Sequence, residues 1–317
     1  MIMNEGFLSK IRMIKNILVK TIKIFIFIVI ALLLSQIVVF FCFSNPRPWQ
    51  CFSLMNDAAS RGNILFVKML MYFGGDINNV TCDRTPLIYA SRYGKTKMVE
   101  FLINNGANVN YSDRLCNNAL SEALSYNYYE TADILLSNGF VINGKQKDCD
   151  LLSPFSCSGE KESIEWLLRH GADAGDSKAL FTVLSCSQED QTQETLNNAV
   201  DVVKLLVASG AKINDVNQRK DTPLHYAAEG KHKVFVEYLV SRGAKINVKN
   251  NAGNTPLHKA VISSNCNADI VKYLIANGAD VSARNNEGQN PFYYAPECKN
   301  YEEISPLFKN SKKHGQR

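Results

Sequence analysis

The sequence lacks the motifs that most often mark catalysis or metal binding. It contains no H-E-x-x-H, G-x-S-x-G or P-loop pattern and no C-x-x-C pair. Zinc hydrolase, serine hydrolase, phosphate-binding and zinc-ribbon sites are therefore not indicated. We expect a chain that is not an enzyme and that uses no metal, no cofactor and no small-molecule substrate.

Strong charge of one sign is also missing from most of the chain. The net charge of +5 arises from 35 Lys or Arg and 30 Asp or Glu, but residues 1–23 alone hold five basic residues and one acidic residue. The remaining 30 basic and 29 acidic residues give a net charge of +1. A nearly neutral body argues against nucleic acid as a ligand. Its hydrophobic share of 46% excludes a mostly disordered chain.

One long hydrophobic run is present near the start. Ile24 to Phe43 contains twenty residues without a charge, enough for a helix to cross the roughly 30 Å hydrocarbon core of a bilayer. We predict a retained transmembrane anchor, because the run is longer than the apolar region of a signal peptide and lacks a small-residue cleavage site. A cleaved signal peptide and a buried helix of a soluble protein are the alternatives.

Flanking charges predict the orientation of this span. The basic segment 1–23 precedes it, whereas only Arg47 and Arg61 follow closely. The positive-inside rule keeps residues 1–23 in the cytoplasm and sends the chain after a linker at 44–51 across the membrane. The body would then be periplasmic in a bacterium, or lumenal or extracellular in a eukaryote.

Internal repeats dominate the rest of the sequence. TPLIYA at 85–90, TPLHYA at 222–227 and TPLHKA at 255–260 share one pattern, and the last two lie 33 residues apart. The pattern T-P-L-H-x-A with this period is typical of ankyrin repeats, and the chain resembles the ankyrin-repeat family. The resemblance implies an all-α solenoid over residues 52–310, with about seven helix–turn–helix units joined by hairpin fingers and a partial C-terminal cap.

A common register runs through seven units. Each has a closing glycine, a leucine four residues before it, and a small or β-branched residue three residues earlier again. The glycines are Gly74, Gly106, Gly139, Gly171, Gly210, Gly243 and Gly278, and the leucines are Leu70, Leu102, Leu135, Leu167, Leu206, Leu239 and Leu274. We expect each glycine to end a second helix in the left-handed conformation. We also expect Thr222 and Pro223 to begin a first helix.

The copies are unequal. The fourth unit has Pro154 inside its expected first helix, which puts that helix in doubt. The fifth has a shortened finger and an extra polar stretch at 188–198. The eighth contains Pro296 and Pro306, and we expect a frayed cap there, followed by a disordered tail at 311–317.

Histidine and cysteine are interpreted as structural. The resemblance places His225 and His258 at the histidine position of the motif, where the family uses the ring for hydrogen bonds between fingers. Cys82, Cys116 and Cys149 recur in finger regions. Equivalent positions in units stacked about 8–10 Å apart are too distant for a disulfide. We therefore favour free, partly buried thiols, with pairing as the alternative in an oxidising compartment.

The resemblance also implies partner contacts on the concave face, from finger tips and from the exposed ends of first helices. The candidate residues are Arg84, Arg92, Tyr93, Arg114, Asn117, Tyr126, Arg219, Asp221 and Glu229. Arg and Tyr most often dominate interface energetics. The first six belong to adjacent units two and three and form the stronger cluster. The alternative is that all nine are ordinary solvated surface residues.

These observations predict a non-enzymatic, membrane-tethered ankyrin solenoid that binds a protein partner on its concave face. Two more specific versions follow from bacterial family members: an envelope immunity protein that neutralises a secreted toxin or enzyme, and a host-directed effector of an intracellular bacterium. A passive envelope scaffold is a further alternative. An enzyme is disfavoured because the repeats and the hydrophobic span leave no room for a catalytic domain.

Overall fold

The computed structural model describes residues 21, 54–143, 150–175, 178–187, 192–263 and 266–311. The predicted span at 24–43, the linker at 44–51, Cys149 and residues 312–317 of the predicted tail lie outside these residues. The chain falls into two compact units, Met1–Phe52 and Ser53–Arg317. Within the described part of the chain, no helix combines the length and the apolarity needed to span a membrane.

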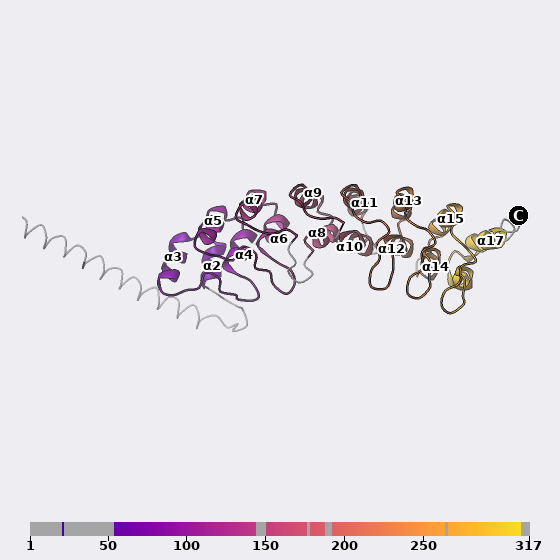
Figure 1. The fold of residues 1–317 in the computed structure, drawn as a ribbon, viewed down its shortest axis with the longest axis horizontal. Helices are drawn as coiled ribbons and strands as arrows, with labels where there is room; N and C mark the ends of the chain where they lie inside the picture. The colour runs from indigo at the N-terminus through magenta and orange to yellow at the C-terminus, as the bar shows by residue number, and fades with distance from the viewer. Residues whose placement is uncertain are drawn as a thin grey trace, which may run out of the picture. The chain divides into compact units, whose positions relative to one another are not determined.

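The described repeats are helical throughout, without a named strand. First helices form one row and second helices form another (Figure 1). The first helices are α2 (Leu54–Ser60), α4 (Pro86–Arg92), α6 (Ala119–Ser125), α8 (Leu152–Ser158), α10 (Ala179–Cys186), α12 (Pro223–Glu229), α14 (Pro256–Ile262) and α16 (Pro291–Tyr294). The second helices are α3 (Ile64–Tyr72), α5 (Thr96–Asn104), α7 (Tyr129–Ser137), α9 (Lys161–Arg169), α11 (Gln193–Ala208), α13 (Lys233–Ser241), α15 (Ala268–Ala276) and α17 (Tyr301–Ser311).

The expected start and stop signals act at the helix ends. Thr255 accepts a hydrogen bond from the His258 amide, while His258 Nδ1 accepts one from the Thr255 amide at 3.1 Å, which forms a capping box. Pro256 fills the first helical position, where a missing N–H costs nothing. All seven closing glycines have φ between 86° and 101°, which confirms the predicted left-handed helix ends.

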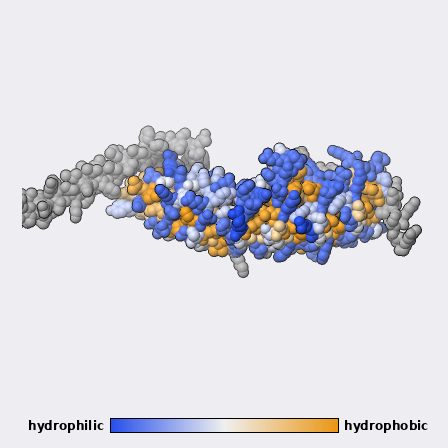
Figure 2. Space-filling view, turned by 90° about the horizontal axis from the view of Figure 1, so that it is seen from above, coloured by the Kyte–Doolittle hydropathy of each residue, from blue (hydrophilic) through white to orange (hydrophobic). Residues whose placement is uncertain are grey.

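The core lies between the two rows of helices. Six of the seven register leucines are fully buried, and Leu70 in the first unit is partly buried. Truncating one such leucine to alanine costs about 2–5 kcal/mol in a packed core. On the surface seen from above in Figure 2, by contrast with the apolar core, hydrophobic patches are interrupted by hydrophilic residues. The apolar stripe of each helix therefore points inward, toward its neighbours.

Two proline-containing units are better ordered than the sequence suggested. Pro154 is the third residue of α8, where the backbone N–H has no intrahelical partner, so the helix forms in spite of it. In the eighth unit, Pro296 lies in a short 3-10 helix, Ala295–Glu297, after α16. Helix α17 runs through Pro306 and buries Ile304 and Phe308. The described part of this unit is packed and not frayed.

A ladder of asparagines connects the bases of successive fingers. Each stands four residues after a closing glycine and donates Nδ2 to the carbonyl oxygen of the next closing glycine, at 2.6–3.1 Å. Each also accepts a backbone amide of the next finger, at 2.7–3.1 Å. The asparagines are Asn78, Asn110, Asn143, Asn214 and Asn247. Gly175 stands at the equivalent position after the fourth unit and has no side chain to continue the ladder.

The described cysteines are disulfide-bonded, so the expectation of free thiols was wrong. Cys157 of α8 is bonded to Cys186 of α10, and Cys266 is bonded to Cys298, each pair with Cα atoms 5.5 Å apart. Cys82 and Cys116 are also disulfide-bonded. The expectation was wrong because it compared equivalent positions. The described pairs have sequence separations of 29 and 32, so each joins non-equivalent positions that approach closely between neighbouring units.

Candidate partner-binding surface

A buried carboxylate organises the candidate residues of the second and third units. Glu122 lies on α6 with its side chain only 7% exposed. Arg84 Nη2, from the finger before α4, lies 2.9 Å from Glu122 Oε1, and Arg92 Nη1, at the end of α4, lies 3.3 Å from Glu122 Oε2. Both guanidinium groups are therefore fixed by one acidic side chain of the next unit. The cluster of three keeps a net charge of +1.

Aromatic residues extend this cluster. Tyr93 and Tyr126 occupy the C-cap positions of α4 and α6 and are 50% and 45% exposed. Arg92 lies over the Tyr126 ring at 5.2 Å, in cation–π geometry. Tyr128 stacks beside Tyr126 at 6.4 Å between ring centroids. Arg92 and Tyr126 are thus in contact across two units, with Tyr93 exposed at the equivalent position one unit earlier.

Of the two candidate residues in the third finger, Arg114 is exposed and Asn117 is hydrogen-bonded within the finger turn. Arg114 and Leu115 are exposed, and Leu115 is the more notable because 82% of its surface is accessible. Asn117 instead donates both its backbone N–H and its Nδ2 to the carboxylate of Asp113, each at 2.8 Å. Asn117 is therefore occupied in shaping the finger turn, whereas Arg114 and Leu115 form its accessible tip.

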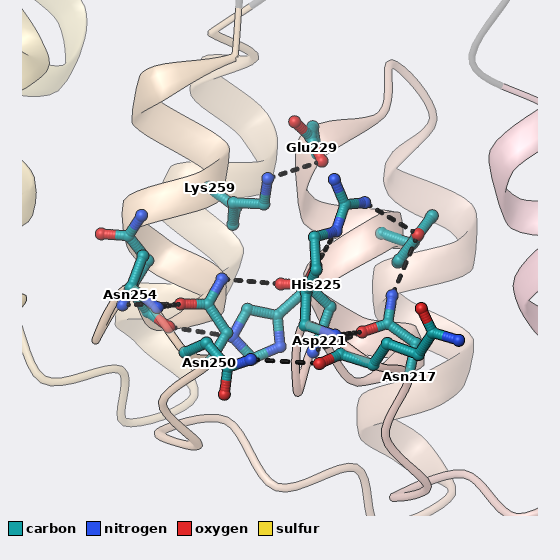
Figure 3. Close-up of polar contacts among 12 residues, drawn as sticks. Asn217, Asp221, His225, Glu229, Asn250, Asn254 and Lys259 are labelled. Carbon is teal, nitrogen blue, oxygen red and sulfur yellow. Dashed lines mark hydrogen bonds and ion pairs between the residues drawn. The ribbon is translucent and has the colours of Figure 1, made fainter.

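Asp221 is also structural. It is buried, and its Oδ1 accepts a hydrogen bond from Nδ2 of Asn250 in the next finger at 2.6 Å (Figure 3). Nearby, the His225 ring joins the same two units, because its Nδ1 accepts the Thr222 amide at 3.0 Å and its Nε2 donates to the Asn254 carbonyl at 3.0 Å. The predicted hydrogen bond between fingers is confirmed at His225.

The two buried histidines are held neutral. Burial lowers the pKa of His225 below 6.5, and the hydrogen bond to Asn254 opposes only part of that effect. Burial lowers the pKa of His258 in the same way, against the hydrogen bond that its Nε2 makes to the Gln289 carbonyl. With one ring nitrogen accepting and the other donating, each ring serves as a fixed structural link.

The remaining two candidates lie in the sixth unit. Glu229 pairs with Lys259 of the next unit at 2.9 Å (Figure 3). Arg219 Nη2 donates to the Tyr226 hydroxyl at 3.0 Å, and this bond is the main cause of the raised pKa of Arg219. Arg219 borders a pocket of about 730 Å³ between α10 and the sixth finger. The surface of this unit is therefore separate from the cluster around Glu122.

Sequence reasoning missed Glu122 and the pocket. Glu122 stands at the variable position of the motif, the position occupied by Tyr226 and Lys259 in later units. An acidic residue there, one unit after Arg84 and Arg92, was the available signal. The signal for the pocket was the shortened fifth finger, beside which the pocket lies. Among the described residues, no group of three or more His, Cys, Asp or Glu is placed to hold a metal ion.

Comparison with known proteins identifies the repeats. A family model of ankyrin repeats, built on three copies, matches residues 55–148, 152–250, 192–285 and 250–316. The crystal structure of the human ASB11 ankyrin repeat domain covers 81% of this chain and is itself covered to 98%, with 21% identity and a TM-score of 0.42.

Curated relatives share part of the chain. FPV031, an ankyrin repeat protein of fowlpox virus, is 43% identical over 127 residues, or 38% of this chain and 37% of the relative. The ankyrin repeat and KH domain-containing protein mask-1 of Caenorhabditis elegans is 29% identical over 147 residues, or 37% of this chain and 6% of the relative. The chain thus spans at most 37% of the length of these relatives. Since the family model matches most of the sequence, the chain belongs to the ankyrin repeat family, whose repeats generally serve as protein–protein interaction modules.

Proposed function

We propose that this chain is a non-enzymatic, membrane-tethered module that holds a protein partner on the face formed by its fingers and first helices. The observation that carries the proposal is the contact between Arg92 and Tyr126 across two adjacent units, on which Tyr93 and Leu115 are also exposed. Aromatic and arginine side chains with restricted rotamers make strong interface contacts at low entropic cost. Glu122 supplies that restriction, because it fixes Arg92 before any partner arrives.

The location of the module is part of the same proposal. The uncharged run Ile24–Phe43 supports a tether. The disulfides Cys157–Cys186 and Cys266–Cys298 support placement of the repeats in an oxidising compartment. A tethered module meets other membrane-associated partners at a raised effective concentration. The immunity and effector versions of this role differ in the partner and in where it is met: a secreted toxin in the envelope, or a host protein inside the host cell.

The interaction is tested by photo-crosslinking of the full chain in its native cells. The comparison is between wild type, the double variant Tyr93→Ala/Tyr126→Ala, and Leu65→Ala, which removes an apolar side chain that is 80% exposed on α3. We expect one crosslinked partner with wild type and with Leu65→Ala, and loss of that partner with the double variant. Equal crosslinking by all three chains would contradict the proposed surface.

Sidedness is tested separately. Alkaline phosphatase, which is active only in oxidising compartments, is fused after Arg317, and a cytoplasm-active reporter is fused at the same point in a second strain. We expect phosphatase activity without cytoplasmic reporter activity. The reverse result would place the repeats in the cytoplasm and would remove the tether's proposed orientation while leaving the binding surface untouched.

A further inference from the structure

The finger between the fourth and fifth units is shorter than its neighbours. Seven residues, 172–178, separate Gly171 from α10, whereas twelve residues, 211–222, separate Gly210 from α12. Long finger loops extend beside α12 and α14 in Figure 1. The five-residue deficit leaves the sixth finger without a full-length neighbour on the side of the fifth unit.

Hydrogen bonds in the later fingers show what such a neighbour would supply. Asn251 of the seventh finger donates its backbone N–H to the Arg219 carbonyl at 2.9 Å, and Asn286 of the eighth donates to the Ala252 carbonyl at 3.0 Å. Gln218 holds the equivalent place in the sixth finger, one residue after the asparagine that anchors each turn. Its N–H has no acceptor among the described residues. A donor at the end of a hydrogen-bonded row is available to an added segment.

The pocket of about 730 Å³ lies beside this donor. Phe181 of α10, Val216 and Tyr226 of α12 form its apolar wall. The Phe181 and Tyr226 rings meet edge to face, with centroids 5.6 Å apart, and Val216 is exposed. A preformed aromatic wall of this kind suits an apolar side chain of a bound segment.

The charged groups at the pocket favour an anionic ligand. Lys178 and Arg219 both line it, whereas Asp215 is the single carboxylate among its described lining residues. Lys178 is exposed and makes no ion pair with another described residue. Arg219 is held in place by its hydrogen bond to the Tyr226 hydroxyl at 3.0 Å and by its ion pair with Asp221 at 3.3 Å. Lys178, the lining cation without an ion pair among the described residues, complements a carboxylate, and the pre-oriented Arg219 offers it further N–H donors.

We propose that this pocket and the vacant place beside the sixth finger, together the notch, bind an extended segment of the protein partner that substitutes for the missing length of the fifth finger. A backbone carbonyl of the segment accepts the Gln218 N–H, an apolar side chain packs against Phe181 and Val216, and an adjacent Asp or Glu pairs with Lys178 and Arg219. The inference rests on the proposed function, since it assigns the chain a protein partner, but it uses residues outside the cluster around Glu122.

The probe is a phage-displayed library of random twelve-residue peptides, selected on the detergent-solubilised full chain. We expect enriched peptides to share an Asp or Glu next to an apolar residue. Their affinities are then measured by fluorescence anisotropy on purified variants. Lys178→Glu and Arg219→Glu each weaken binding about tenfold or more, whereas Lys204→Glu, which changes an exposed lysine on α11, leaves it unchanged.

The backbone contact has its own matched pair. Gln218→Pro removes the N–H and suits the second position of the turn that the Lys220 N–H closes on the Asn217 carbonyl at 2.9 Å. Gln218→Ala keeps the N–H. We expect about fivefold weaker binding for the proline variant, the equivalent of one hydrogen bond, and unchanged binding for the alanine variant. Circular dichroism establishes that both variants fold.

Three outcomes would overturn the inference: no acidic consensus, selected peptides that bind every variant equally, or occupation of the notch by a second copy of the chain, seen as self-association that Gln218→Pro abolishes. The double variant Tyr93→Ala/Tyr126→Ala separates this inference from the proposed function. It should lose the cellular partner yet still bind the selected peptides. Loss of the partner without any selected peptide would reject the notch alone.

Discussion

Arg84 and Glu122 belong to different repeats, yet Arg84 Nη2 lies 2.9 Å from Glu122 Oε1 in a site where the carboxylate is almost fully buried. A buried carboxylate is costly unless it is paired, and Arg92 provides its second partner. The same two arginines that suit a partner are therefore also needed to keep the second and third units together.

We predict non-additive stability losses at this cluster. Arg84→Met or Arg92→Met alone should cost about 1 kcal/mol, because one guanidinium still pairs with Glu122, whereas the double variant should cost about 3 kcal/mol by leaving the carboxylate unpaired. Urea unfolding in a double-mutant cycle measures the difference. Arg114→Met, at an exposed finger tip, is the control and should change little. Additive losses would show that Glu122 does not depend on the pair.

The buried histidines should make stability depend on pH. The folded-state pKa values of His225 and His258 are lowered, so below about 6.5 the unfolded chain binds more protons than the folded chain. Stability is then full above about pH 6.5 and declines as the pH falls toward the folded-state values. Thermal unfolding from pH 7.5 to 5 should show this decline.

A double variant tests whether His225 and His258 cause the pH dependence of stability. His225→Gln/His258→Gln should flatten the pH dependence while lowering stability at neutral pH, since glutamine cannot reproduce both ring hydrogen bonds. A slope unaffected by the double variant would assign the titration to other groups.

Loss of the Cys157–Cys186 bond should weaken the array at its fifth unit. The closed loop has a sequence separation of 29, for which loop entropy gives about 3–4 kcal/mol. Cys157→Ser/Cys186→Ser should lower the free energy of unfolding by about that amount. Limited proteolysis should then cut first near residues 172–178. Cys266→Ser/Cys298→Ser, with a similar separation of 32, is the matched control and should shift cleavage to the C-terminal cap instead.

A buried hydroxyl offers a stabilising change. Ser91 Oγ has no hydrogen-bond partner among the described residues, although the side chain is fully buried on α4. Ser91→Ala removes this unsatisfied group and should stabilise the chain by about 1 kcal/mol. Ser156→Ala is the contrasting variant, because Ser156 Oγ donates to the Leu152 carbonyl at 2.7 Å, and it should destabilise by a similar amount. Chemical unfolding of both variants distinguishes the two cases.

Alanine variants of two glycines in equivalent turns distinguish the cost of backbone strain from the cost of a steric clash. Gly62 and Gly94 both have positive φ, but a Cβ on Gly94 would lie 2.6 Å from the Tyr128 ring, whereas on Gly62 it would meet only the flexible Lys95 side chain at 3.3 Å. Gly62→Ala should cost about 1 kcal/mol, and Gly94→Ala about 1–3 kcal/mol more. Urea unfolding of both variants measures the two losses.

The periodic part of this fold was predictable because it depends on local chemistry. The Thr-Pro caps, the closing glycines and the buried leucines follow from helix boundaries and from one repeated register. The non-periodic features were not predictable in the same way. The Cys157–Cys186 pair joins different positions of two units, and Glu122 binds arginines from the unit before it. Such contacts depend on the offset between neighbouring units, which a comparison of equivalent positions does not reveal.

The absence of an asparagine at Gly175 has a consequence for how the array comes apart. In a one-dimensional stack, each unit is coupled only to its neighbours, so the weakest coupling decides where cooperativity breaks. Asn143 links the fourth finger to the fifth, and the Cys157–Cys186 bond also joins the fourth and fifth units, whereas Gly175 leaves the fifth and sixth fingers without the amide link found elsewhere in the described ladder. Under a stretching force, we therefore expect the array to separate first between the fifth and sixth units, while the Cys157–Cys186 bridge keeps the fifth unit attached to the N-terminal block.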